Sequence, residues 1–511
     1  MSWLRDRRLG KADQAAVPAE AVVTGPRLDA TVEHALRGLF GRDSLYMLTW
    51  ALHLVASAAV TPLITRMMGV SEFGAVATAI AVMQVLFVVT GLGLRTAIQR
   101  HYIGPDGPTA AARLLLLTIV LAGMLTVLTD STGPLWSRYV GFESYSDVLR
   151  LAVYWAGASA VTNASLAMLR SQDRLLAFSC VSLLQSVIAA AAGLLLVLVH
   201  PTATMFLLAQ LSMQVVAMGV ALCLAPPKLL RPQDRKLARD ALVYGLPLVP
   251  AVLSSFVLGS ADRLVVQAQL GLTAVARYQV AYNVGDLPIL LLGVLSDAWM
   301  PRIFALNVAA ERNAVLAASW DALYRLLTPV LIGLSIGAPL VLRVWVPSSY
   351  RPDDLLLVTA VVIVSAVPYT AGLAARRALL AEGRTTIIAA ATGVAAVVNI
   401  GLNLMLVPHY ELVGSAAATF LSYGVLYGVL LLRVRVVLPR RNSPLRLLKV
   451  AAAMVIALLA AALPTSRAFL VLRGVVVIAS LVWFGWILVQ LNRRRPAPSD
   501  DPLVRVSGPP S

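Results

Sequence analysis

Charged residues are scarce in this chain: only 13% of its 511 residues are Asp, Glu, Lys or Arg, whereas 59% are hydrophobic. A soluble domain of this size cannot bury so many apolar side chains, so the composition excludes a soluble globular protein. The apolar residues occur in windows of about 20, the length of a helix that crosses the hydrocarbon core of a bilayer. The sequence therefore predicts an all-α polytopic membrane protein.

Cysteine and acidic residues are also few. The two cysteines, Cys180 and Cys223, both lie in apolar runs, so they can build neither a disulfide framework nor a metal cluster. Basic residues outnumber acidic residues by 42 to 25, but they are scattered through short loops instead of being gathered in one domain. This scatter is typical of the charge bias that orients membrane proteins, so we expect no nucleic-acid partner.

Features of an enzyme are missing as well. The sequence contains no glycine-rich loop that would cradle a phosphate, so we expect no nucleotide hydrolysis. The longest predicted outer loop, residues 130–150, is too short to hold a soluble catalytic site. We therefore expect a protein that is not an enzyme and needs no cofactor, with a proton or Na⁺ gradient as the candidate energy source.

About fourteen membrane-spanning helices are predicted from the apolar windows. They cover roughly residues 44–65, 73–94, 113–133, 148–169, 176–199, 203–225, 245–268, 274–298, 323–346, 354–375, 385–406, 412–432, 446–463 and 468–491. With the N-terminus inside, inner loops rich in Lys and Arg alternate with poorer outer loops along the whole chain. Both termini are therefore predicted to be cytoplasmic.

Two six-helix halves are expected, because short sequences recur at a fixed spacing. Gly69-Val-Ser-Glu-Phe-Gly aligns with Gly271-Leu-Thr-Ala-Val-Ala at an offset of 202 residues, and the same offset places Gln84 on Asp286. An even number of helices gives two pseudo-symmetric lobes of the same orientation around a central cavity. The predicted parts are a cytoplasmic, partly disordered extension (1–43), an N-terminal lobe (44–225), a cytoplasmic linker (226–244), a C-terminal lobe (245–433), two additional helices (445–491) and a cytoplasmic disordered tail (492–511).

Polar residues are concentrated between Ser260 and Arg302. Those of the eighth span share one helical stripe and are Gln279, Asn283, Asp286, Gly293 and Asp297. A polar stripe inside a bilayer is costly unless it faces protein or water, so we expect this stripe to line a transport cavity. Asp286 lies about 18 Å from the outer end of its span, where it would bind a cation, a proton or an arginine. It is therefore a candidate for ion coupling, with a buried structural pair as the alternative.

Asp262 and Arg263 lie toward the outer end of the seventh span. Arg263 would suit the diphosphate of a lipid carrier, because a guanidinium group matches phosphate oxygens. In the alternative, Arg263 extends to the outer interface and Asp262 neutralises its charge. Asn283 and Gln84 are further candidates for substrate contacts in the same cavity.

Five further residues carry open alternatives. Arg95 and Asp297 either form a salt bridge that closes an inner gate, or Arg95 is an ordinary inner charge. Arg100 and Arg302 either attract an anionic head group at the cytoplasmic entrance or serve topology alone. His53, in the first span, is either a proton relay that takes part in coupling or a hydrogen-bonded core histidine.

Three groups of motifs, spread from about residue 44 to 433, resemble one family. They are Gly69-Val-Ser-Glu-Phe-Gly with Gly91-Leu-Gly-Leu-Arg-Thr-Ala; Tyr244-Gly-Leu-Pro-Leu with Ser260-Ala-Asp-Arg-Leu, Val280-Ala-Tyr and Pro301-Arg; and Leu380-Ala-Glu-Gly-Arg-Thr with Asn399-Ile-Gly-Leu-Asn-Leu and Val413-Gly-Ser-Ala-Ala-Ala-Thr. Together they resemble the polysaccharide-transport (Wzx-like) flippases of the multidrug/oligosaccharidyl-lipid/polysaccharide exporter superfamily. Val70-Ser71 stands where a Pro-Glu pair is common in the family, and the N-terminal extension and two extra helices are similar to the lipid II flippase branch.

The resemblance implies that the protein flips a lipid-linked saccharide of the undecaprenyl-diphosphate type from the inner to the outer leaflet of a bacterial inner (plasma) membrane. The implied partners are this substrate and membrane lipids, with a polysaccharide polymerase and glycosyltransferases as further candidates. One rival function is a cation-coupled multidrug exporter of the same superfamily, which would need acidic residues inside the first two spans. Another is a multi-pass saccharide polymerase or acyltransferase, which would need a large outer loop.

Overall fold

The computed structural model describes residues 60–104, 106–304, 309–434, 444–464 and 466–493. Within these residues all regular structure is helical, and helices occupy every predicted span from the second to the fourteenth. Nine of the described helices are long and apolar enough to cross a membrane, or ten if one bent pair of helices counts as a single span. The all-α polytopic fold with two lobes is thus confirmed.

The N-terminal lobe is made of the helices between residues 70 and 224. They are α3 (Val70–Gly91), α4 (Leu94–Tyr102), α5 (Gly107–Ser131), α6 (Gly133–Tyr139), α7 (Asp147–Ser171), α8 (Leu175–Leu183), the π-helical turn η2 (Leu184–Ile188), α9 (Ala189–Val199) and α10 (Ala203–Leu224). At the centre of the lobe, α7 packs against α3, α5 and α10. Small residues permit this packing: a Cβ on Gly157 would overlap the hydroxyl of Thr126 in α5.

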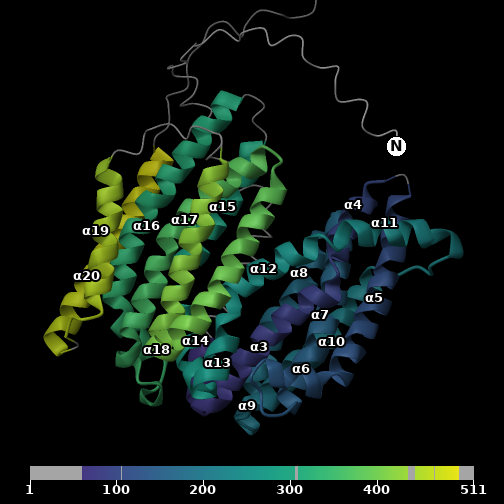
Figure 1. The fold of residues 1–511 in the computed structure, drawn as a ribbon, viewed down its shortest axis with the longest axis horizontal. Coiled ribbons are helices and arrows are strands. Elements are labelled where there is room, and N and C mark those ends of the chain that lie inside the picture. The colour runs from purple at the N-terminus through teal and green to yellow at the C-terminus, as the bar shows by residue number, and fades with distance from the viewer. Residues whose placement is uncertain (1–59, 105, 305–308, 435–443, 465, 494–511) are drawn as a thin grey trace, which may run out of the picture.

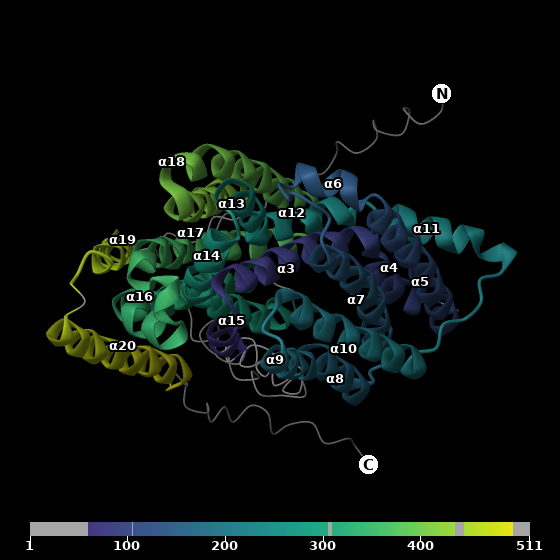
Figure 2. The same ribbon diagram turned by 90° about the horizontal axis from the view of Figure 1, so that it is seen from below.

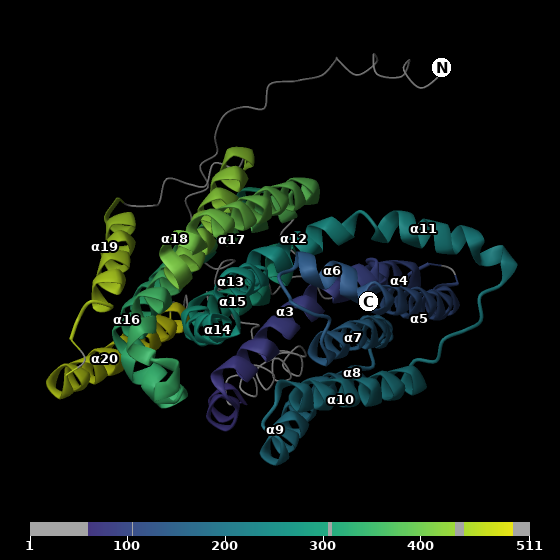
Figure 3. The ribbon, with the colours of Figure 1, turned by 60° about the horizontal axis from the view of Figure 1, so that its bottom comes forward.

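The C-terminal lobe and the two extra helices follow a short linker. Their helices are α12 (Leu248–Ser260), α13 (Asp262–Leu270), α14 (Leu272–Gly285), α15 (Leu287–Phe304), α16 (Ala309–Trp345), the 3₁₀ turns η4 (Ser348–Tyr350) and η5 (Pro352–Leu355), α17 (Leu356–Ala381), α18 (Thr385–Arg433), α19 (Pro444–Ala460) and α20 (Arg467–Arg493). Two segments of α18 meet at Glu411, whose backbone is non-helical (φ 48, ψ −130), so α18 contains both the eleventh and the twelfth predicted spans. The extra helices α19 and α20 pack on α16, on the side of the molecule away from the N-terminal lobe (Figures 2 and 3).

The linker between the lobes is largely helical. It contains η3 (Pro232–Asp234) and α11 (Arg235–Gly245). The apolar side of α11, with Ala241, packs in the same cluster as Leu94 and Ile98 of α4. Asp234 also forms a salt bridge of 2.9 Å with Arg113 of α5. The linker is therefore docked on the N-terminal lobe over most of its length.

The eighth predicted span is not one straight helix. It consists of α14 and α15, which are bent by 45° relative to each other. The break lies at Asp286, two residues before Pro288, whose ring nitrogen cannot donate to the helical hydrogen-bond ladder. The predicted polar stripe therefore runs over two helices, with Asp286 at their junction and α15 continuing at an angle to α14.

The two lobes meet at one end of the molecule, where α3 and α14 begin; we call this the closed end. Gly74 of α3 lies so near the backbone of Leu272 in α14 that a Cβ would come within 1.9 Å of its carbonyl oxygen. The rings of Phe73 and Tyr350 also meet edge to face across the lobes, with centroids 6.1 Å apart. From here the lobes diverge toward the opposite end, the open end, where α4 and α11 lie (Figure 1).

The two lobes share local details that support an internal repeat. The first residues of α3 and α14 are 202 positions apart, at the offset expected from the sequence. In the N-terminal lobe, Arg174 donates to the carbonyl oxygen of Leu224 at the end of α10 (2.5 Å). In the C-terminal lobe, Arg384 donates in the same way to Arg433 at the end of α18 (2.8 Å). A guanidinium at a helix C-terminus satisfies carbonyls that have no partner inside the helix.

Candidate functional site

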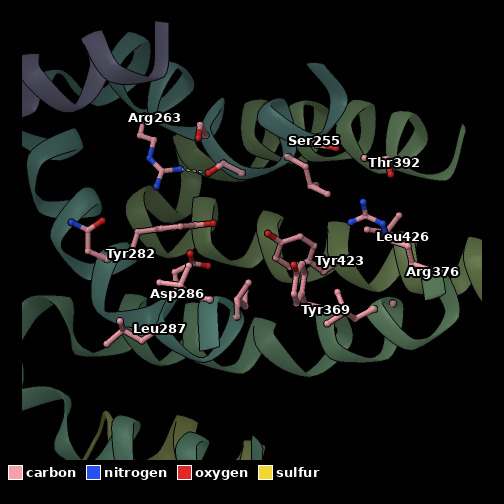
Figure 4. Close-up of a pocket in the computed structure, with 18 of the residues that line it drawn as sticks. Ser255, Arg263, Tyr282, Asp286, Leu287, Tyr369, Arg376, Thr392, Tyr423 and Leu426 are labelled. Carbon is pink, nitrogen blue, oxygen red and sulfur yellow. Dashed lines mark hydrogen bonds between the residues drawn. The ribbon is translucent and has the colours of Figure 1, made fainter. Parts of the chain in front are cut away.

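A cavity of about 460 Å³ lies within the C-terminal lobe. Its walls come from α12 to α18, with Thr61 of the first span as the one lining residue from the N-terminal lobe in the described part of the chain. The lining side chains that carry polar atoms are Thr61, Ser255, Ser260, Arg263, Tyr282, Asn283, Asp286, Trp345, Tyr369, Arg376, Thr392 and Tyr423. Figure 4 shows Asp286 and Arg376 at opposite sides of this space, with the rings of Tyr369 and Tyr423 between them.

Asp286 is placed in the cavity wall by the break between α14 and α15. Within the described residues its carboxylate accepts no hydrogen bond and forms no ion pair, and its side chain is partly accessible from the cavity. An unpaired carboxylate inside a membrane domain is costly unless a cation, a proton or a polar ligand meets it. The geometry therefore makes Asp286 available to a ligand in the cavity.

Arg263, by contrast, is bound by its own lobe. Its Nη1 lies 2.8 Å from Oδ1 of Asp262, and the two side chains are only 7% and 2% exposed. Its Nε donates to Gln279 (2.9 Å), and its guanidinium covers the ring of Tyr282 at 4.1 Å. Asp262 also accepts a hydrogen bond of 2.7 Å from the hydroxyl of Tyr278. The alternative in which Arg263 extends to the interface is wrong, and Asp262 lies behind the cavity wall.

Asn283 lines the cavity at the end of the same polar chain. Its side-chain oxygen accepts a hydrogen bond of 2.6 Å from Gln279, which itself accepts from Arg263. On the neighbouring wall, Ser260 donates to Gln84 of α3 (2.8 Å). Gln84 is thus a contact between the lobes that supports the wall from behind.

The remaining predicted residues are not brought together here. Arg95 is exposed at the start of α4, and Arg100 places its guanidinium 4.3 Å from the ring centre of Tyr244 in the linker. Neither of these arginines lines this cavity. The physical reason is that the lobes diverge from the closed end, which separates α4 from the C-terminal lobe (Figure 1).

The structure does not describe the side chains of three predicted residues. The backbone of Asp297 and Arg302 belongs to α15, but their side chains are not described, and nothing of His53 is described. The salt-bridge gate, the entrance role of Arg302 and the histidine relay therefore stay predictions.

Arg376 is a charged lining residue that sequence reasoning missed. The sequence placed it, with Arg377, among the ordinary inner charges, but the structure separates the two: Arg376 is exposed and lines the cavity. Arg377 is buried and donates to Ser296 at 2.7 Å and to Ser319 at 3.1 Å. A signal was present in the sequence, because the lining residues of α17 follow a spacing of i, i+3, i+4 and i+7. They are Tyr369, Gly372, Leu373 and Arg376.

An apolar groove of about 420 Å³ adjoins the polar cavity. It lies between α15, α16 and α20, and Leu287 and Leu290 line both spaces. The other lining residues are Leu291, Val294, Pro329, Val330, Gly333, Leu334, Gly337, Val341, Val477, Ser480, Leu481 and Phe484. The extra helix α20 thus completes a surface that suits hydrocarbon, next to a space that suits a polar group.

Sequence comparison decides the family. Residues 63–355, more than half of the chain, match a family of polysaccharide biosynthesis proteins. The chain belongs to this family. Among curated proteins, none matches the sequence.

Solved structures of transporters share the fold. The lipid II flippase MurJ, in an inward closed conformation, aligns with a TM-score of 0.67 and 13% identity, over 88% of this chain and 98% of MurJ. A multidrug resistance MATE family transporter of the MOP superfamily, in an inward-facing conformation, aligns with a TM-score of 0.59 and 16% identity, over 81% of this chain and all (100%) of that protein. A MOP superfamily transporter from Pyrococcus furiosus aligns at 0.53 and 16% identity, over 85% of this chain and 99% of that protein. These likenesses show that this family member has a multi-pass membrane fold like that of MurJ and the MATE transporters.

Proposed function

We propose that the protein is a flippase that moves a lipid-linked saccharide of the undecaprenyl-diphosphate type across a bacterial inner membrane, for surface polysaccharide or cell-wall synthesis. The observation that carries this proposal is the shared wall, Leu287 and Leu290, between a polar cavity and an apolar groove. A substrate with a polar head and a long hydrocarbon tail needs both environments at once. Membership of a polysaccharide biosynthesis family supports a saccharide as the head group.

Arg376 is the residue that we expect to hold the diphosphate. It is exposed to the cavity and, within the described residues, makes no hydrogen bond or ion pair, whereas the charge of Arg263 is offset by Asp262. A guanidinium group donates two parallel hydrogen bonds to phosphate oxygens, and a free one loses no existing partner when it does so. Thr392 lies near Arg376 in the wall and offers a further hydroxyl donor (Figure 4).

Transport would follow alternating access of the two lobes. The contacts between Phe73 and Tyr350 and between Gly74 and Leu272 shut the closed end, while the lobes diverge at the open end. Basic residues of α4 and α11 gather at the open end, which by the positive-inside rule is cytoplasmic. The head group would thus enter from the inner leaflet and leave when the closed-end contacts separate.

Depletion of the protein in its native cell tests this function directly. We expect a lipid-linked saccharide to accumulate in the inner leaflet, as measured by extraction of lipids and by the protection of their sugars from an external glycosidase. Absence of any such accumulation would contradict the flippase proposal. Accumulation of a cationic drug inside the cells, with normal lipid-linked saccharides, would favour the multidrug exporter.

Substitution of Arg376 tests whether this residue binds the diphosphate. In proteoliposomes, Arg376→Gln should reduce binding of undecaprenyl diphosphate lipids by about 10- to 100-fold, because a hydrogen bond to a charged group is lost. Arg376→Lys keeps the charge but loses the paired N–H donors of the guanidinium group, so we expect an intermediate affinity. Arg239→Gln, an exposed arginine on α11, is the matched control and should bind like wild type. Equal affinities for Arg376→Gln and Arg239→Gln would remove Arg376 from the site.

A further inference from the structure

Two tyrosines occupy the middle of the cavity wall, between its acidic and basic sides. Tyr369 of α17 and Tyr423 of α18 both line the space, with Asp286 on one side and Arg376 on the other (Figure 4). Their ring centroids are 5.2 Å apart and their planes are inclined by 65°. The rings therefore meet edge to face instead of stacking on each other, and both line the cavity.

The two rings differ in burial. Tyr423 is only 6% exposed and belongs to the core cluster of the lobe, whereas Tyr369 is more accessible and packs against that cluster. Tyr423 therefore fixes the orientation of its neighbour. Gly293 of α15 lies beside the hydroxyl of Tyr369, where a Cβ would be 3.8 Å from that oxygen, an ordinary van der Waals contact. Tyr369 thus presents a fixed aromatic surface to the cavity.

The surroundings of this surface suit a sugar ring. A pyranose has C–H groups on its faces, which pack on the electron-rich face of an aromatic ring, and hydroxyls on its rim. Asp286 provides a polar group for the rim at one side of the aromatic pair, and Asn283 lines the same cavity. Arg376 at the other side would hold the phosphate to which the sugar is attached. The cavity of about 460 Å³ is within the range of pockets that hold small ligands, about 300–1,000 Å³.

We infer that Tyr369, positioned by Tyr423, is the platform on which a pyranose ring of the substrate head group stacks, with Asp286 accepting hydrogen bonds from sugar hydroxyls. This inference rests on the proposed function and adds that the cavity recognises the sugar itself, in addition to the diphosphate. Tyr369 is then a residue that determines specificity: it favours a head group with an apolar sugar face over the bare lipid diphosphate.

The test compares two lipids on the full-length protein in nanodiscs. The probes are undecaprenyl diphosphate carrying one glucose and undecaprenyl diphosphate without sugar, and the readout is the Kd for each. We expect wild type to bind the glucose-bearing lipid about tenfold more tightly, and Tyr369→Leu to lose this preference while its Kd for the sugar-free lipid stays unchanged. Tyr369→Phe keeps the ring and should keep the preference. Tyr410→Leu, at a tyrosine exposed outside the cavity, should behave like wild type.

Each contrary result has a separate meaning. If Tyr369→Leu weakens both lipids equally, or keeps the preference for glucose, the platform is refuted while the flippase proposal stands. If wild type binds neither lipid, the proposed function itself fails. As a second variant that preserves an aromatic ring, Tyr369→Trp should show a change in its added tryptophan emission with the glucose-bearing lipid and none with the sugar-free lipid. Identical emission with both lipids would also refute the platform.

Discussion

Asp286 and Arg263 line the same cavity, but only the side chain of Arg263 is held by neighbouring side chains. Arg263 is held by Asp262, Gln279 and the ring of Tyr282, so its charge is compensated within the lobe. Asp286 has no such partner among the described residues. An arginine with several partners is suited to fixing the shape of the wall, and a carboxylate without partners is suited to reversible binding of a ligand.

At the residue scale, the response of an Asp286 variant to an ion gradient tests ion coupling apart from the contact of Asp286 with the substrate. Asp286→Asn keeps the size of the side chain but removes its charge, so a coupling cation or proton loses its site. We expect the rate of lipid flipping in proteoliposomes to fall about tenfold or more and to stop responding to a pH or Na⁺ gradient. Asp240→Asn, at an exposed position of α11, is the matched control. A variant with the wild-type rate and the wild-type response to the gradient would end the coupling hypothesis.

At the scale of elements, the closed end depends on the approach of α3 to α14. Gly74 permits this approach because it has no Cβ, and the atom that a Cβ would meet is a backbone carbonyl of Leu272, which cannot rotate away. Any larger side chain must therefore push the two helices apart. Bent helices contribute as well, since the break at Asp286 lets α14 meet α3 while α15 runs toward α16 and α17.

Gly74→Val should consequently open the closed end. In a background without Cys180 and Cys223, a cysteine at the cavity residue Thr61 should react with a membrane-impermeant maleimide from the closed-end side only when Gly74→Val is present. Gly91→Val is the matched control, because a Cβ at Gly91 would meet no atom within 4 Å. Equal labelling with and without Gly74→Val, together with normal flipping, would show that the contact does not hold the end closed.

At the scale of the whole molecule, the orientation in the membrane sets the direction of transport. The arginines and lysines of α4 and α11 lie at the open end, and the loop around η4 and η5 lies at the closed end. The positive-inside rule predicts that the open end faces the cytoplasm, and the proposed function then requires the structure to be open to the inner leaflet.

Single cysteines can measure this orientation. In the same cysteine-free background, Lys236→Cys on α11 should be labelled only after the membrane is permeabilised, whereas Ser348→Cys in η4 should be labelled on intact cells. Both positions are exposed, so accessibility should depend on the side of the membrane alone. The reverse pattern would invert the orientation and, with it, the proposed direction of transport.

Much of the fold followed from the sequence because its causes are local. An apolar run of about 20 residues must be helical in a bilayer, since only a helix satisfies its own backbone hydrogen bonds there. The predicted spans from the second to the fourteenth accordingly coincide with described helices. The positions of Asn283 and Asp286 in the cavity wall could also be predicted from the sequence. Polar residues on one face of an apolar helix must turn toward protein or water.

The tertiary structure alone decided what depends on residues far apart in the chain. It placed Arg376 in the cavity and Arg377 against Ser296 and Ser319, although the two arginines are neighbours in the sequence. The linker helix α11 packs on α4, and Gln84 lies behind the cavity wall, where it accepts a hydrogen bond from Ser260. Which segments form apolar helices follows from the sequence alone, because each helix satisfies its own backbone hydrogen bonds. Which side chains share one cavity depends on how bent helices from distant parts of the chain pack together.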